Sequence, residues 1–304
     1  MSKINSDSLI KRLVLIKYLF ITAEEQSQQQ SASAGLSVLA FHDCVEMLLV
    51  LIAHHKNKKV QDHFLDYWHV IPELPYKGNM ENLNNVRISL KHYATLPNND
   101  EIDRCCADVK LFLNDSIKHF WNIDFDDLLL SSLISFNEVK EDMEKAETFM
   151  AESKIYESLE KAKTAFIKLL SIYDSSKELW YDSIFNIGVK VGNDYQKFLR
   201  EYKGSTKWYE QVTQTVNAAR DTLKITSLGI DYKKYILFNF ITPRVTVGCN
   251  SDGIIYLPES KSDFEARRNV GFQDCQFCIS FVVDCALKLQ EFNFDINRYL
   301  KSNS

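Results

Sequence analysis

The spacing of apolar residues along the chain predicts a mainly helical protein. Near the N-terminus, apolar side chains recur every three to four residues, which predicts a helix over residues 7–23 with one apolar face. Residues 35–55 are apolar nearly all round, as is typical of the central helix of a bundle. Three polar residues interrupt this second helix: His42, Asp43 and Glu46.

A helix with two different faces is predicted over residues 83–97. One face carries an apolar stripe formed by Leu83, Val86, Leu90 and Tyr93. The other face carries polar residues and one apolar residue: Asn84, Asn85, Ile88, Lys91 and His92. Pro97 ends the helix, and Asn98 or Asn99 caps the next one, over residues 101–120. Such a mixed second face usually contacts something other than water.

The remaining segments complete a two-domain plan. Residues 60–69 and 124–134 predict short helices, and residues 71–80 predict a loop. We place a domain boundary near residue 135, so that a helical bundle over residues 1–135 precedes a helical domain over residues 136–304. Helices are predicted over residues 138–173 (one helix or a pair), 179–202, 206–223 and 263–292. Residues 235–240, 242–247 and 254–257 predict a small antiparallel β element, with turn residues at 249–253.

Composition supports this fold class and narrows the compartment. The 304 residues include only 9 glycines and 5 prolines, which favours long helices. A net charge of −5 argues against a chain that coats nucleic acid non-specifically. The 7 cysteines, an odd number and mostly within apolar patterns, are typical of reduced thiols in a cytoplasmic protein. Lys17 interrupts the first apolar segment and no small-residue cleavage site follows it, so we expect no signal peptide. The longest apolar run elsewhere, over residues 47–53, is too short to span a membrane.

Arg87, followed after four residues by His92, is the one arrangement in the chain that looks like chemistry, and metal-free cleavage of RNA is a reaction that two such groups can perform. RNA carries its own nucleophile, the 2′-hydroxyl, so a ribonuclease can work without a metal if it moves protons and stabilises charge. Histidine can take or donate a proton near neutral pH, and arginine offers fixed donors to phosphoryl oxygens. One histidine acts as base or acid only, so we expect a symmetric dimer, with Ile88 in the interface.

The same stretch resembles a known family. The segment Asn84–Pro97 (NNVRISLKHYATLP) and the preceding helix (FHDCVEMLLVLIAHH) are similar to HEPN (higher eukaryotes and prokaryotes nucleotide-binding) domains. These helical bundles occur in prokaryotic toxin–antitoxin and phage-defence proteins, and many are metal-independent ribonucleases whose site forms across a dimer. The resemblance implies that Arg87 and His92 are catalytic and that Lys91 is an accessory cation. It covers residues 1–135 only.

The resemblance has one departure, which leads to a second hypothesis. Ile88 follows Arg87, where active members commonly carry a polar residue. Some relatives keep the bundle without cleaving RNA. The alternative is therefore a non-catalytic module that uses this helix face for dimerisation or for binding a nucleotide or protein.

Simpler interpretations compete with each motif. Arg87 could form an ion pair with Glu46, leaving His92 as an ordinary surface residue. Neighbouring histidines such as His54 and His55 lack the spacing of a metal site, and the Cys275-x-x-Cys278 pair lies inside a predicted core helix. We expect no metal and no cofactor. The expected partners are single-stranded RNA, a second copy of the chain, and an antitoxin or other protein, with Glu46, Asn84 and Asn85 as accessory residues of the site.

Overall fold

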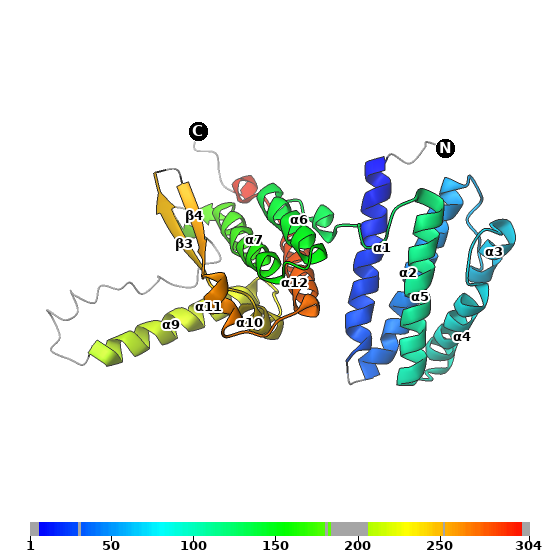
Figure 1. The fold of residues 1–304 in the computed structure, drawn as a ribbon, viewed down its shortest axis with the longest axis horizontal. Coiled ribbons are helices and arrows are strands. Elements are labelled where there is room, and N and C mark those ends of the chain that lie inside the picture. Colours follow the sequence, from blue (N-terminus) through cyan, green and yellow to red (C-terminus); the bar gives the residue numbers. More distant parts are fainter. Residues whose placement is uncertain (1–5, 30–31, 180–181, 184–205, 252, 300–304) are drawn as a thin grey trace. The chain divides into compact units, whose positions relative to one another are not determined.

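A computed structural model describes residues 6–29, 32–179, 182–183, 206–251 and 253–299 (Figure 1). The chain divides into two compact units, Met1–Leu133 and Ile134–Ser304. The fold is mainly α-helical with a small antiparallel β element, as the sequence predicts. Each unit has its own buried core and is described separately.

The first unit is a helical bundle built around one apolar helix. Its long helices are α1 (Ser6–Ser27), α2 (Ala32–His55), α4 (Lys77–Tyr93) and α5 (Asn99–Trp121), and its short ones are η1 (Phe64–Asp66), α3 (Tyr67–Val70) and η2 (Leu130–Leu133). Helix α2 contacts α1, α4 and α5, and buries residues along nearly its whole length. Two short helices differ from their predicted lengths. In place of the predicted helix over 60–69 the chain forms η1 followed directly by α3, and in place of the one over 124–134 it forms only η2.

By length and composition alone, α2 could cross a membrane. In this bundle, however, 61% of its apolar window is buried against other helices. The core helix of a soluble protein has the same property, so the all-round apolar pattern is explained by packing.

Helix α4, which carries the Arg87 and His92 motif, differs from its predicted bounds at both ends. It begins at Lys77, so the predicted loop over 71–80 ends earlier than expected. At its C-terminus the chain turns into the left-handed conformation at Ala94, whose amide donates to the carbonyl of Leu90. Tyr93 therefore lies in the last turn and is 76% exposed, whereas the sequence placed it in the apolar stripe. The buried residues of α4 are Met80, Leu83 and Leu90.

The start of α5 follows the prediction closely. Asn98 is the N-cap, and its side chain accepts a hydrogen bond from the amide of Glu101 at 2.9 Å. The Glu101 carboxylate accepts one from the amide of Asn98, also at 2.9 Å. This reciprocal pair satisfies two backbone donors that a helix start otherwise leaves without partners.

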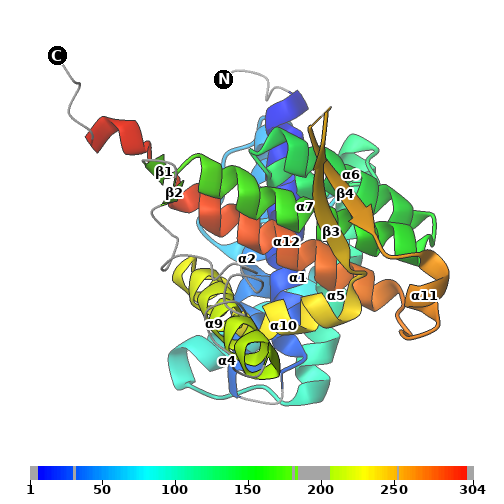
Figure 2. The same ribbon diagram turned by 90° about the vertical axis from the view of Figure 1, so that its left-hand side faces the viewer.

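The second unit packs a helix pair against the last long helix. Helices α6 (Asn137–Ala151) and α7 (Ile155–Ser175) form the pair, and both contact α12 (Phe272–Glu291) (Figure 2). Also described are β1 (Glu178–Leu179), β2 (Asp182–Ser183), α9 (Thr206–Ser227), α11 (Lys261–Glu265) and η3 (Ile296–Tyr299). Most of the helix predicted over 179–202 lies outside the described residues. The β element is a hairpin of β3 (Val245–Asn250) and β4 (Gly253–Pro258), with Asn250 opposite Gly253 at the turn.

One predicted strand is wrong. Residues 235–240 (YILFNF) belong to helix α10 (Tyr232–Ile241), not to the β element. Asp231 caps this helix by accepting hydrogen bonds from the amides of Lys233 and Lys234. Phe238 is fully buried, with its ring centroid 5.2 Å from that of Phe166 and 4.8 Å from that of Phe281. Aromatic packing against two helices and a good cap outweigh the β propensity of the segment.

Candidate functional site

Helix α4 presents the motif residues on two sides. Arg87 is half-buried next to the core stripe, and His92 is exposed. Five residues of helix turn the chain by about 140° beyond a full turn, so the two side chains leave α4 in different directions. Within one copy of the chain, the helix geometry therefore does not bring them to one point.

Of the other predicted site residues on α4, Lys91, Asn84 and Ile88 lie between these two directions, and Asn85 lies just beyond His92. Lys91 and Asn85 are exposed, and Asn84 and Ile88 are half-buried. Arg87 forms no ion pair with any carboxylate among the residues that the structure describes. This half-buried guanidinium therefore keeps its donors for another partner, which suits an anion.

The structure places a residue opposite this surface that the sequence analysis did not single out as functional. His42, on α2, is 2% exposed, and its ring lies against Phe64 with centroids 4.2 Å apart and an interplanar angle of 30°. The pKa of His42 is lowered to about 4, mainly by burial and also by the positive charges of Arg87 and Lys91, while Asn84 acts in the opposite direction. His42 is therefore uncharged at neutral pH, and it lies close to the α4 residues that carry the motif.

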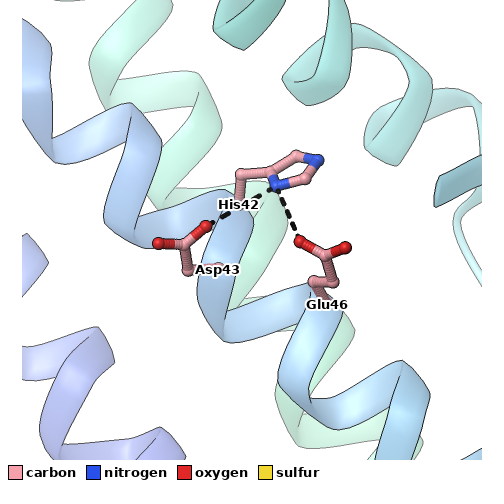
Figure 3. Close-up of side chains that lie close together, drawn as sticks. All are labelled: His42, Asp43 and Glu46. Carbon is pink, nitrogen blue, oxygen red and sulfur yellow. Dashed lines mark ion pairs between the residues drawn. The ribbon is translucent and has the colours of Figure 1, made fainter. Parts of the chain in front are cut away.

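The predicted pairing of Glu46 with Arg87 does not form among the described side chains. Glu46 is 52% exposed, and one of its oxygens lies 3.8 Å from Nδ1 of His42. An oxygen of Asp43 lies 4.0 Å from the same nitrogen (Figure 3). Because the Glu46 carboxylate reaches water, it does not need a cation to balance its charge, and the reason for pairing it with Arg87 no longer holds.

A shallow groove of about 560 Å³ runs between α1 and α2 beside these carboxylates. Its lining is mostly apolar and includes Leu15, Leu19, Asp43, Glu46, Met47 and Val50. Asp43 and Glu46 thus lie at a border, with His42 on one side and an apolar surface of α1 and α2 on the other.

The other sequence motifs have structural explanations. Nδ1 of His55 accepts a hydrogen bond from the Trp121 indole at 3.2 Å. Cys275 and Cys278 are buried in α12, where burial raises the pKa of both thiols, that of Cys275 to about 11. These thiols are protonated at neutral pH, which disfavours zinc binding and redox chemistry.

Two arginines near the hairpin, Arg267 and Arg268, have partners within the protein. Arg267 pairs with Glu259, and Arg268 lies over the ring of Phe240, 4.4 Å from its centroid. These contacts hold α11 against neighbouring elements. Because both guanidinium groups are engaged within the protein, Arg87 on α4 is the better candidate for a contact to phosphate.

No protein-family model matches this chain, and no curated protein or solved structure matches it. The function must therefore be argued from the side chains themselves.

Proposed function

We propose that the protein is a metal-independent endoribonuclease that acts as a homodimer. The observation that supports this most is the α4 surface, where an exposed imidazole and an exposed ammonium accompany a half-buried guanidinium that has no carboxylate partner in the described part of the chain. The resemblance of Asn84–Pro97 to HEPN domains points to the same residues. A toxin-like or phage-defence role in the cytoplasm, with the second unit or an antitoxin as regulator, belongs to this proposal.

The reaction needs only groups that RNA and this surface supply. The 2′-hydroxyl attacks the adjacent phosphorus and gives up its proton to one His92 acting as general base. The bond from phosphorus to the 5′-oxygen breaks, and that oxygen takes a proton from an acid. Arg87 stabilises the charge on the phosphoryl oxygens, with Lys91 as an accessory cation. The products are a 2′,3′-cyclic phosphate and a 5′-hydroxyl end.

A second copy of the chain would supply the acid. Because Arg87 and His92 leave one α4 helix in different directions, a two-fold axis beside α4 is needed to bring the groups of two copies together. Ile88 lies between these directions and supplies an apolar contact for such an interface.

The test uses the purified full-length chain and single-stranded RNA in excess EDTA. We expect cleavage with cyclic-phosphate ends, and a loss of at least about a hundredfold in rate for His92→Ala and for Arg87→Ala. His63→Ala and Arg104→Ala change exposed residues outside the proposed site and serve as matched controls. Thermal unfolding checks that each variant is folded. Cleavage that survives both α4 substitutions would remove the assignment.

The alternative function is a non-catalytic interaction module. It is favoured by apolar residues in the last turns of α4 and just after it, since Ile88 is accompanied by the exposed side chains of Tyr93 and of Leu96, the latter 52% exposed. In this case no RNA is cut, and Ile88→Asp converts a dimer to monomers in size-exclusion chromatography with light scattering. Loss of cleavage together with loss of the dimer in Ile88→Asp would favour the nuclease instead.

A further inference from the structure

We propose that His42, Asp43 and Glu46 bind a divalent transition-metal ion, with zinc as the best match. The proposed site goes beyond the ribonuclease proposal and does not depend on it. It also differs from the expectation of the sequence analysis, which found no metal-binding spacing among the other histidines.

The spacing of the three residues suits a site on one helix. His42 and Glu46 are four residues apart on α2, so their side chains lie on the same face in successive turns. Asp43 follows His42 directly and reaches the same point from the side (Figure 3). One ligand atom from each of the three lies within 4.8 Å of the others.

The distances fit a site that needs only a small adjustment. Nδ1 of His42 lies 3.8 Å from the Glu46 oxygen and 4.0 Å from the Asp43 oxygen. A tetrahedral zinc ion with bonds of about 2.0–2.1 Å holds its ligand atoms about 3.3 Å apart. The two carboxylates are more than half exposed, so they can close this difference by rotamer changes without moving the helix.

The independent observation that points to a ligand is the state of the His42 ring. The side chain is 98% buried, and neither ring nitrogen makes a well-aligned hydrogen bond among the described residues, with Asn84 as the one side chain near enough to interact with the ring in that way. A buried polar atom without a partner costs free energy, and natural structures rarely leave one. Nδ1 lies toward the two carboxylates in Figure 3, so an ion placed between them would satisfy this nitrogen.

The ring is also held in position before any ion binds. Phe64 packs against it, which restricts its rotation. Asn84 lies near the ring and is the candidate acceptor for the proton on Nε2, which would leave the Nδ1 lone pair available for a metal.

Charge and ligand type select the ion. Two carboxylates bring a charge of −2, which balances a divalent cation; the positive charges of Arg87 and Lys91, which also act on the ring, oppose it. An imidazole with two carboxylates suits zinc and neighbouring first-row ions better than magnesium or calcium, which prefer oxygen ligands alone. Three protein ligands leave a fourth position for water.

The experiment titrates zinc into the full-length chain by calorimetry, after removal of metals and chelator. Cys249 is the exposed thiol and a competing zinc ligand, so all variants carry Cys249→Ser. We expect one ion per chain, and at least about tenfold weaker binding for Glu46→Gln and for Asp43→Asn. Both are exposed isosteric changes that keep α2 folded. Glu81→Gln, an exposed glutamate on α4, is the matched control and is expected to bind as the parent does.

Cobalt provides a second readout that is independent of catalysis. Cobalt bound at this site should give the visible absorption of a tetrahedral ion with nitrogen and oxygen ligands, without a thiolate charge-transfer band. The absence of stoichiometric binding, or binding that is unchanged in both Glu46→Gln and Asp43→Asn, would overturn the proposal. RNA cleavage in EDTA is measured separately, so a failure of either proposal leaves the other to be judged on its own data.

Discussion

Lys163 is a cation held among apolar groups in the second unit. Its ammonium donates to the side chain of Asn239 and lies 5.1 Å from the ring centroid of Phe238. Burial lowers the pKa of Lys163 from 10.5 to about 8. Between these two values the unfolded chain binds more protons than the folded one, so the free energy of unfolding rises with pH across this window. Below pH 8 the unfavourable burial of the charge is fully present.

Replacing this cation should therefore stabilise the protein in a pH-dependent way. We expect Lys163→Met to raise the free energy of unfolding at pH 7 by on the order of 1–3 kcal/mol, with a gain that shrinks toward pH 10. Urea unfolding at several pH values measures the difference from wild type. Lys161→Met on the same helix is the control, because Lys161 pairs with Glu160 nearer the surface. A gain that stays constant from pH 7 to pH 10 would contradict the linkage to Lys163.

Individual residues also show what the sequence could predict about the site. The helical period of α4 places His92, Lys91 and Asn85 away from the core stripe, and all three are exposed in the single chain. These positions could be predicted because they depend only on the helix itself. The neighbourhood of His42 could not be predicted, because no period reveals which helix packs opposite a given face. The sequence signal for a site at His42 was the presence of this polar residue inside an otherwise apolar helix.

At the scale of elements, α10 is the clearest error of the sequence analysis. Its aromatic and β-branched composition predicted a strand, and the cap that decides otherwise is a single residue, Asp231. The two strands that were predicted correctly, β3 and β4, flank turn residues that specify a hairpin. Helix ends were also less predictable than helix existence, because the start of α4 depends on Tyr76 in a left-handed conformation.

The cap of α10 can be tested directly. Asp231→Ala removes the acceptor for two backbone amides and should lower the free energy of unfolding by about 1 kcal/mol. Asp231→Asn keeps an acceptor oxygen and should be close to wild type. Chemical unfolding followed by circular dichroism measures both variants. Equal stability of the two variants would show that packing of Phe238, rather than the cap, determines this helix.

At the scale of the whole molecule, the two units each have a separate core. The core of Met1–Leu133 is formed around α2, and that of Ile134–Ser304 around α7 and α12. The sequence placed the boundary near residue 135 from a change in composition, next to the division seen between Leu133 and Ile134.

Separate cores predict separate folding. Fragments 1–133 and 134–304 should each give a helical circular dichroism spectrum and a cooperative thermal transition. The matched control is fragment 1–110, which ends inside α5 and should fail to fold. An unfolded 1–133 fragment would mean that the first unit depends on the second.

The apolar character of α2 has a consequence during protein synthesis. This helix leaves the ribosome before α4 and α5, so only α1 can shelter it at first. At about 5–20 residues per second, the segment from His55 to Trp121 takes roughly 3–13 s to emerge. During that interval the nascent chain displays a stretch as apolar as a membrane span, which chaperones and targeting factors can recognise. The yield of soluble protein should therefore depend on translation speed downstream of His55.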